Sequence, residues 1–377
     1  MELRDFSTQV GKLIYARGLT EQRRIISKLE SLLARSRRAK EALDAIPALL
    51  ERFRQSVLAA AFRGDLTADW RAQHPDVEPA SKLLERICIE RRHRWEEAEL
   101  EKMRAKGKAP KDDSWKEQYD EPSTPEPIDT TPENWCYASL NQLRAIEPNS
   151  LTDGPFGSNL KTSDYVPEGI RVIRLGNLGI GNLDLTDEAF ISSEKFNGLR
   201  KHELFAGDLV IAALAEPLAR CCEIPASLGP AIVKADCIRF KPHPAVCSRL
   251  IMHYLNSPQG RSTAESLGHG IGRLRINMEN LRQLPVPILP AEEQQLLMQR
   301  IEALLHRIEV LGGVYTSAQD RLLSMDEAVL AKAFRGDLVP QDPNDEPASV
   351  LLERIRAERE ATTGSAPKRP RGRRPAA

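Results

Sequence analysis

The stretch AlaPheArgGlyAspLeu occurs twice in this chain, at residues 61–66 and again at 333–338. The two copies stay alike upstream without a gap, at a constant offset of 272 residues, as far as Glu21 and Glu293. Downstream, GluProAlaSer at 78–81 returns at 346–349. Repeats of a solenoid follow one another directly, whereas these copies lie far apart. We therefore interpret them as two arms with a separate domain between them.

Each arm predicts a long helix, because apolar residues recur every three or four positions. Gly64 and Gly336 follow the last periodic residues, where a helix end favours a left-handed residue. Pro47 in the first arm and Gly312–Gly313 in the second predict a kink or a short break in each. A single stripe of this kind is typical of ordinary core packing, but two copies favour an antiparallel coiled coil between the arms. Its seam is predicted to contain Leu29, Leu33, Leu50, Phe53, Ile301, Leu305, Leu322 and Met325.

Composition limits the classes of protein to which the chain can belong. Of its 377 residues, 41% are hydrophobic and 29% are charged, which allows two or three structural units. Lys plus Arg and Asp plus Glu both number 54, so a DNA-binding face would have to come from local clustering of charge. No apolar run is long enough for a bilayer and no signal-type segment opens the chain, so we expect a cytoplasmic protein.

The six cysteines show no CxxC pairing, and two of them are neighbours. They predict reduced core thiols, with a structural zinc as the less favoured alternative. The six are Cys88, Cys136, Cys221, Cys222, Cys237 and Cys247.

Composition and periodicity divide the chain into eight stretches, and the expected fold class is α+β, a mixed α/β domain flanked by two long helices. The proline-rich linker and the basic tail are expected to be extended or disordered. In order, the stretches are an unstructured segment (1–19), the first arm (20–66), a charged helical extension (67–106), a linker (107–131), the α/β domain (132–290), the second arm (291–338), a C-terminal helical region (339–360) and the tail (361–377).

Within the central domain, short apolar runs separated by turns predict strands at 171–174, 208–213, 231–234 and 237–240. A short helix is predicted at 249–256. ProValProIleLeuPro at 285–290 closes the domain, and its prolines are expected to break any strand there.

Signatures of catalysis are missing from the sequence. GxxxxGK[ST], HExxH, the [DNS]PP[FY] loop of amino-methyltransferases and a nuclease-like Asp…Glu-x-Lys cluster do not occur in a suitable context. Gly176, Gly179 and Gly181 form a glycine-rich turn without the strand and helix of a nucleotide-binding unit. We therefore predict no catalytic residue and no metal site. The tail LysArgProArgGlyArgArgPro (368–375) is similar to an AT-hook, but Arg374 intervenes before Pro375, so a solubilising tail is the favoured reading and DNA affinity the alternative.

Several motifs in a fixed order resemble one known family. They are GlyProPheGlySerAsnLeuLysThrSerAspTyr (154–165), GluGlyIleArgValIleArg (168–174), AlaGlyAspLeuValIle (206–211), ArgIleAsnMetGluAsnLeuArgGlnLeuProValProIle (275–288) and ProAlaGluGluGln (290–294). Together they resemble a target-recognition domain of the type I restriction-modification specificity subunits and its entry into a helical spacer. The two arms resemble the spacer helices of that family, so the resemblance covers residues from about 20 to 360.

The resemblance implies a subunit that performs no chemistry and binds no cofactor itself. It would read double-stranded DNA and hold methyltransferase subunits, which use S-adenosylmethionine, and restriction subunits, which use ATP and Mg. Family members usually carry two recognition domains, whereas the pattern here indicates one. We therefore expect that a separate domain or a second copy supplies the other half-site, or that the chain is a remnant. The rival readings are a stand-alone nuclease or methyltransferase with an unrecognised site, and a coiled-coil scaffold that has lost DNA binding.

Three groups of polar residues are the candidates for DNA contact, since Arg and Asn can bond to base edges while Lys holds phosphates. Each group also has an ordinary reading as surface charge or turn-stabilising residues. They are Ser158, Asn159 and Lys161; Arg171 and Arg174; and Arg273, Arg275 and Asn277.

Overall fold

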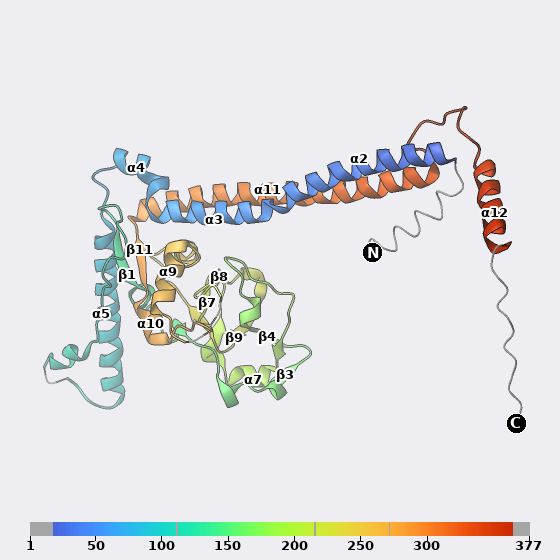
Figure 1. Ribbon diagram of the computed structural model, residues 1–377. Helices are drawn as coiled ribbons and strands as arrows, with labels where there is room; N and C mark the ends of the chain where they lie inside the picture. Colours follow the sequence, from blue (N-terminus) through green and yellow to red (C-terminus); the bar gives the residue numbers. More distant parts are fainter. Residues whose placement is uncertain (1–17, 111, 215, 271, 365–377) are drawn as a thin grey trace, which may run out of the picture. The chain divides into compact units, whose positions relative to one another are not determined.

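The computed structural model describes residues 18–110, 112–214, 216–270 and 272–364 (Figure 1). The chain divides into two units. One is Glu51–Ile308, and the other combines Met1–Leu50 with Glu309–Ala377. The fold class is α+β, as predicted. Most of the predicted unstructured N-terminal segment and most of the basic tail lie outside the described residues. In the part of the chain that is described, no helix is long and apolar enough to cross a membrane.

The first arm consists of two helices, α2 (Leu19–Asp44) and α3 (Ile46–Phe62). The interruption at Ala45 confirms the predicted kink, and Pro47 falls in the first turn of α3, where its missing N–H removes no helical hydrogen bond. The second arm is one helix, α11 (Ala291–Arg335), of 45 residues. The predicted break at Gly312–Gly313 is wrong, because glycine keeps its N–H donor and costs a helix only about 1 kcal/mol.

Both arms end in the same turn. Gly64 and Gly336 each have φ = 85°, the left-handed conformation predicted for them. After each glycine comes an aspartate that pairs with the arginine before it. The Arg63 Nη2–Asp65 Oδ2 distance is 2.6 Å and the Arg335 Nε–Asp337 Oδ2 distance is 3.1 Å. We call these two turns the Arg-Gly-Asp corners, residues 63–65 and 335–337.

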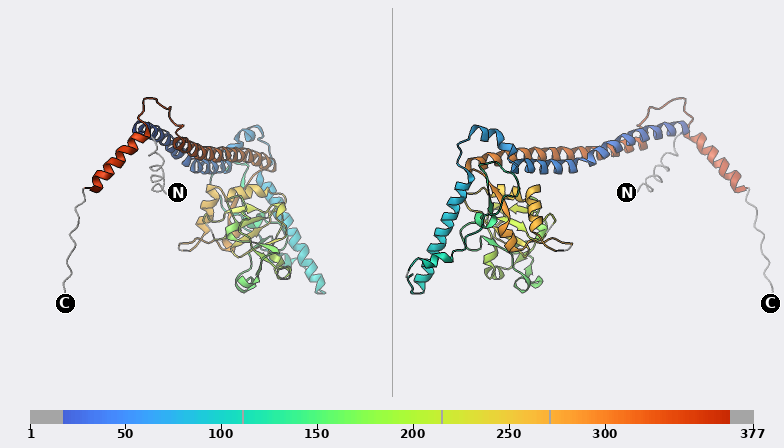
Figure 2. Two further views of the ribbon diagram at one scale, coloured as in Figure 1. Left: turned by 90° about the vertical axis from the view of Figure 1, so that its right-hand side faces the viewer. Right: turned by 60° about the vertical axis from the view of Figure 1, so that its left-hand side comes forward.

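In the unit of residues 18–50 and 309–364, α2 runs beside α11 in the opposite direction (Figures 1 and 2). The buried Ser36 donates a hydrogen bond from Oγ to Asp326 Oδ2 at 2.7 Å, and Arg24 pairs with Asp345. The Leu50 side chain lies against Gly312, where α11 has no side chain. α12 (Ala348–Gly364) follows the second corner.

Two residues of the predicted seam are exposed, so their placement in the seam is wrong. Phe53 is 46% exposed and Met325 is 47% exposed. The buried face of α3 is formed instead by Val57, Leu58 and Ala61, and Phe53 lies at its edge. Met325 borders an open hollow of about 1060 Å³ together with Leu322, and the positions of α2 that line this hollow are Ala39, Ala42 and Leu43. Among the other predicted seam residues, Ile301 is fully buried and Leu29, Leu33, Leu50, Leu305 and Leu322 are half-buried.

In the unit Glu51–Ile308, the charged extension forms α4 (Ala68–Gln73) and α5 (Ala80–Ala105). The predicted linker is not simply extended, since residues Ser114–Gln118 form a short 3₁₀ helix, η2. Trp115 is buried and stacks on Trp95 with 5.9 Å between ring centroids, while the Tyr119 ring lies 5.3 Å from that of Trp95. The linker was expected to be extended or disordered because of its prolines and charges. The contacts of Trp115 and Tyr119 with Trp95 instead stabilise a folded conformation in this part of it.

The central domain begins and ends in one small sheet. β1 (Cys136–Ser139) pairs antiparallel with β11 (Pro285–Ile288), with Tyr137 opposite Pro287. The expectation that prolines would break this strand is therefore wrong. In a two-stranded sheet each strand keeps one unpaired edge, and prolines two residues apart can both turn their donor-less nitrogens to that edge.

Two larger sheets make up the rest of the domain, and the four predicted strands correspond to β4, β7, β9 and β10. The four-stranded sheet has the order β2-β10-β7-β8 and contains only antiparallel neighbours. The five-stranded sheet has the order β3-β5-β4-β9-β6, and its β4 and β9 are parallel. The strands are β2 (Leu151–Thr152), β3 (Tyr165–Val166), β4 (Ile170–Ile173), β5 (Phe190–Ile191), β6 (Glu203–Leu204), β7 (Leu209–Ala212), β8 (Cys221–Glu223), β9 (Ala231–Val233) and β10 (Cys237–Phe240).

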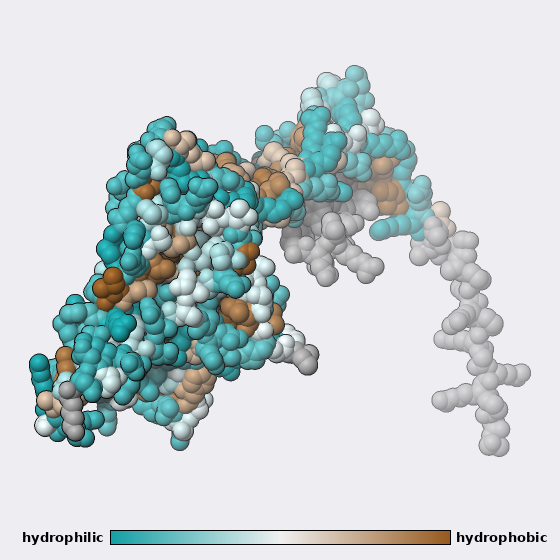
Figure 3. Space-filling view, turned by 90° about the vertical axis from the view of Figure 1, so that its left-hand side faces the viewer, coloured by the Kyte–Doolittle hydropathy of each residue, from teal (hydrophilic) through white to brown (hydrophobic). Residues whose placement is uncertain are grey.

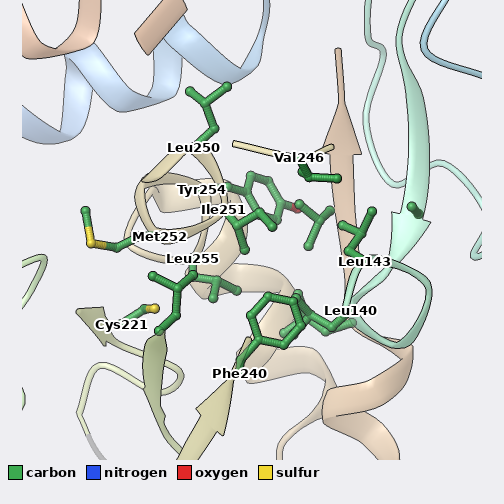
Figure 4. Close-up of a cluster of buried hydrophobic side chains, with 14 of the residues drawn as sticks. Leu140, Leu143, Cys221, Phe240, Val246, Leu250, Ile251, Met252, Tyr254 and Leu255 are labelled. Carbon is green, nitrogen blue, oxygen red and sulfur yellow. The ribbon is translucent and has the colours of Figure 1, made fainter. Parts of the chain in front are cut away.

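Short helices cover the sheets and form the main core. Figure 4 shows α8 packed above Phe240 and beside Leu140 and Leu143. The Phe62 ring at the end of the first arm meets Tyr254 of α8 edge-on, with 5.2 Å between centroids. The helix predicted at 249–256 is confirmed as α8. The helices of this domain are α6 (Leu140–Leu143), α7 (Ser193–Asn197), α8 (Ser248–Leu255), α9 (Pro258–Leu267) and α10 (Met278–Gln283).

All six cysteines are free thiols, and Cys221, Cys222 and Cys237 lie in the core as predicted. Burial raises the pKa of the Cys222 thiol to about 12. In the described residues, no group of three or more His, Cys, Asp or Glu side chains is placed to hold a metal ion.

A buried carboxylate joins the first arm, the domain and the second arm. Glu293 is completely buried at the start of α11 and accepts hydrogen bonds from Thr67 Oγ1 at 2.6 Å and Trp135 Nε1 at 2.9 Å. Arg71 pairs with the same carboxylate at 2.5 Å and donates from Nη2 to the Gly64 carbonyl at 2.6 Å. The corner of the first arm is thereby fixed to the first turn of the second.

Candidate nucleic-acid interface

Two of the three predicted polar groups come together at one end of the domain, around Arg275. Arg275 forms backbone bridges with Leu214 and with His269. Its guanidinium lies 2.8 Å from Asp236 Oδ1 and 5.7 Å from the centroid of the Phe156 ring. The loop that holds Ser158, Asn159 and Lys161 is therefore beside the loop that holds Arg273, Arg275 and Asn277. We call the surface formed by residues 156–161 and 273–277 the Arg275 surface.

The first loop presents polar side chains to solvent. Ser158 and Asn159 are exposed in the 3₁₀ turn η3 (Gly157–Asn159). Lys161 is also exposed, and its backbone N–H donates to Asp164 Oδ2 at 2.7 Å, which fixes the start of the next turn. Exposed Phe156 opens the loop. A lysine, two small polar side chains and an aromatic ring suit contact with phosphates and bases.

The three predicted residues of the second loop differ in their exposure and in their contacts. Arg273 is exposed, whereas Arg275 is partly buried by its contacts with Asp236 and Phe156. Asn277 caps α10, because its Oδ1 accepts a hydrogen bond from the Asn280 backbone N at 2.7 Å. Asn277 therefore also has a structural role, in line with its ordinary reading as a residue that stabilises local backbone, although its side chain remains exposed.

A carboxyl group lies under the Arg275 surface. Asp153 Oδ1 accepts hydrogen bonds from the backbone N of Gly154 at 2.7 Å and of Asp236 at 3.0 Å. Burial raises the pKa of Asp153 to about 6, and the nearby Asp236 acts in the same direction while Arg275 opposes it. The charge of this surface consequently depends on pH in the range near 6.

The remaining predicted group, Arg171 and Arg174, is largely neutralised. Arg171 of β4 pairs with Glu188 and packs over the Phe190 ring. Arg174 follows β4 directly, and its Nη2 lies 2.5 Å from Asp187 Oδ1. Both arginines therefore already have carboxylate partners, unlike exposed Lys161, for which no ion pair occurs among the described residues.

Sequence reasoning missed Lys234, which it assigned to a strand. β9 ends one residue earlier, at Val233, so Lys234 lies at the carboxyl end of that strand. Its ammonium lies 5.5 Å from the centroid of the Tyr165 ring. The sequence contained one signal for Lys234, a basic residue directly after an apolar run. Its importance depends on the parallel pairing of β4 with β9, which the sequence does not reveal.

The surface drawn in Figure 3 is mainly hydrophilic, with hydrophobic residues in small separate patches. No family model matches the chain. In comparisons with individual proteins, the Type I restriction enzyme EcoBI specificity subunit of Escherichia coli is 26% identical over 355 residues, covering 92% of this chain and 64% of that protein. The EcoDI specificity subunit, also of Escherichia coli, is 25% identical over 357 residues, covering 92% of this chain and 68% of that protein. The chain thus spans about two thirds of the length of these relatives.

Among solved structures, the HsdS subunit from Thermoanaerobacter tengcongensis aligns with 85% of this chain and 59% of that one, at 17% identity and a TM-score of 0.43. A score of this size adds no argument, so the relationship rests on sequence. Along 92% of its length, the chain is similar to the specificity subunits of type I restriction enzymes.

Proposed function

We propose that the chain is a DNA-reading specificity subunit of a type I restriction enzyme, without catalytic activity of its own. The observation that carries this proposal is the similarity to several such subunits along 92% of the chain. The Arg275 surface supports it, because it gathers exposed basic, amide and aromatic side chains from two loops at one end of a domain. Arg and Asn side chains read base edges, while Lys side chains and backbone N–H groups hold phosphates.

On this proposal, exposed Arg273 and Asn159 contact base edges and Lys161 contacts the backbone. Arg275 also forms an ion pair with Asp236, whose carboxylate would otherwise repel phosphates. The domain reads one half-site of the target. Its binding should weaken steeply as salt rises, because each neutralised phosphate releases counterions.

We further propose that the arms form an antiparallel coiled coil that acts as the spacer. Within each unit, the contacts support this pairing. Ser36 bonds to Asp326 in one unit, and Ile301 of α11 is buried in the same core as Leu58 of α3 in the other. Leu33→Asp should weaken the α2–α11 packing, whereas Leu33→Met should be tolerated, and limited proteolysis of the arms reports the difference.

The Arg-Gly-Asp corners are the proposed docking points for two methyltransferase subunits. In each corner the arginine and aspartate are exposed, so burial alone does not explain why the same three residues recur. The double variant Asp65→Ala and Asp337→Ala should reduce co-purification with the methyltransferase subunit. Glu51→Ala is the matched control, because Glu51 also forms an exposed pair on the arm, with Arg54, but has no counterpart in the second copy.

The decisive experiment compares the purified chain, the methyltransferase subunit and their mixture in DNA methylation with S-adenosylmethionine. Methylation should require both proteins, and restriction should require the further subunit that uses ATP and Mg. The chain alone should bind DNA in a salt-dependent manner and leave it unmodified. Methylation or cleavage by the chain alone would contradict the proposal and favour an enzyme, and a chain that binds no DNA under any of these conditions would be a scaffold.

A further inference from the structure

A pocket opens at the carboxyl ends of the two parallel strands of the domain. β4 and β9 are in register with Ile173 opposite Val233, and the Lys234 N–H donates to the Ile173 carbonyl at 2.8 Å. Arg174 and Lys234 therefore leave the sheet side by side. The carboxyl ends of parallel strands are a frequent place for ligands, because the chains diverge there and leave a crevice.

The pocket has a volume of about 490 Å³, within the range of sites for small groups. Its walls combine two cations, two aromatic rings, a hydroxyl and a carboxylate. They are Arg174, Lys234, Tyr165, Phe190, Thr162 and Glu188. A site with this lining suits an anionic group attached to a flat or apolar body.

The charges leave a net positive pocket. Arg174 is paired with Asp187, and Glu188 is paired with Arg171, so these four side chains cancel. Lys234 has no carboxylate within ion-pair distance among the described residues and instead lies over the Tyr165 ring, with its Nζ 5.5 Å from the centroid. One ammonium is therefore available to an incoming anion.

Two residues that line the pocket carry donors without acceptors. The Tyr165 hydroxyl is buried and has no hydrogen-bond partner among the described residues, and the same holds for Arg174 Nε. A buried hydroxyl or guanidinium N–H without an acceptor is costly, and an anion that supplies several oxygens would remove that cost.

We propose that this pocket binds one backbone phosphate of DNA, through Lys234, Tyr165 and Arg174. The pocket adjoins the Arg275 surface, since Thr162 directly follows Lys161 and Lys234 lies two residues before Asp236, the partner of Arg275. A strand of DNA whose bases meet the Arg275 surface places a neighbouring phosphodiester at the pocket. This inference rests on the proposed function and adds to it a specific anchor for the backbone, which fixes register without reading sequence.

The test measures DNA affinity of the full chain by fluorescence anisotropy at several salt concentrations, alone and with the methyltransferase subunit. Lys234→Gln should make the plot of log K against log salt shallower by about 0.9. It should weaken binding to target and random DNA by the same factor. Lys201→Gln is the control, because it removes the same charge from an exposed position outside the pocket and should leave the slope unchanged.

Tyr165→Phe tests the role of the pocket without changing the charge of the protein. It should lower affinity by roughly ten- to a hundredfold, from the loss of one hydrogen bond to a charged group, and leave the salt slope unchanged. If Lys234→Gln and Tyr165→Phe both bind like the parent, the pocket does not hold a phosphate, although the parent's DNA binding would still support the proposed function. If the parent binds no DNA alone or with its partner, the proposed function itself fails.

A further experiment distinguishes a DNA phosphate from a small free anion as the ligand of the pocket. Inorganic phosphate is added to the protein without DNA, at constant ionic strength, and thermal unfolding is followed. We expect no stabilisation beyond that of chloride. A stabilisation in the parent that Lys234→Gln abolishes would mean a site for free phosphate and would overturn the assignment to DNA.

Discussion

The indole Nε1 of Trp135 lies 2.9 Å from a carboxylate oxygen of Glu293, and both side chains are buried. Trp135 is at the entrance of the central domain and Glu293 is in the first turn of the second arm. Because Arg71 and Thr67, just beyond the first corner, bind the same carboxylate, one side chain connects three parts of the chain. A buried charge with several partners makes the geometry of this junction specific.

Glu293→Gln should therefore be strongly destabilising. Thr67 and Trp135 donate to different oxygens of the carboxylate, so the single amide oxygen can accept from only one of them. The amide also leaves the Arg71 guanidinium without its counter-charge, and breaking a buried pair in this way costs about 3 kcal/mol. Glu292→Gln, at the exposed neighbouring position, should change stability by less than about 0.5 kcal/mol. Calorimetry of the two variants checks the difference, and equal melting temperatures would contradict the role of the junction.

Ile301→Ala should reveal which face of the second arm is packed. Ile301 is fully buried, so its truncation should lower the free energy of unfolding by about 2–4 kcal/mol. Leu311→Ala on the same helix removes a side chain that is 50% exposed and should cost much less. Urea denaturation followed by circular dichroism measures both, and a larger loss for Leu311→Ala would show that the packed face is assigned wrongly.

The free energy of unfolding should depend on pH because of the carboxyl group of Asp153. Its folded pKa of about 6 lies above the ordinary value of 3.8, so between these pH values the folded protein holds a proton that the unfolded chain has lost. Stability from this group is therefore full below about pH 4 and is lost as pH rises through 6. The full shift would correspond to roughly 3 kcal/mol, and we expect about 1–2 kcal/mol because the carboxyl keeps some solvent contact.

Asp153→Asn isolates this effect, since an amide oxygen can accept both backbone hydrogen bonds. The variant should gain stability over the parent between pH 4 and 6.5, with a plateau above. His253 opposes the trend, because burial lowers its pKa to about 4 and its neutral form gains stability as pH rises, but it acts in both proteins and cancels in the difference. A difference that does not change with pH would contradict the raised pKa.

Arg275→Ala should weaken DNA binding more than Arg273→Ala. Each loses one cation, which should make the salt slope shallower by about 1, but loss of Arg275 also leaves the Asp236 carboxylate unpaired on the surface. Adding Asp236→Asn to Arg275→Ala should recover part of the affinity. If the double variant binds no better than Arg275→Ala, Asp236 does not face the DNA.

Local patterns in the sequence were sufficient for most of the fold. The runs that became β4, β7, β9 and β10 are rich in Val and Ile and are bounded by turn residues, so their conformation is set locally. The left-handed Gly64 and Gly336 were equally predictable from helix ends. β11 was not, because its prolines are acceptable only on the free edge of a strand, and that edge is defined by the partner β1.

The candidate interface was predictable as a set of residues and not as an arrangement. Ser158, Lys161 and Arg273 could be chosen by side-chain type, yet the contact of Arg275 with Phe156 joins positions far apart in sequence. Lys234 was missed for the same reason, since its position beside Arg174 depends on the parallel pairing of β4 with β9. Pairing between distant segments is a tertiary property that a local pattern does not record.

The β1–β11 ladder also bears on how such a protein can change over evolutionary time. Because Cys136 faces Ile288 and Ser139 faces Pro285, the chain leaves the domain beside the point where it enters. The Leu140 N–H donates to the Leu284 carbonyl at 3.1 Å, which closes the ring. The segment between those two leucines therefore has its two ends held together, whatever its length. An insertion or deletion between Leu140 and Leu284 would leave the points where the domain joins the two arms unchanged, so we expect the domain to tolerate changes in its length without a change in the arms.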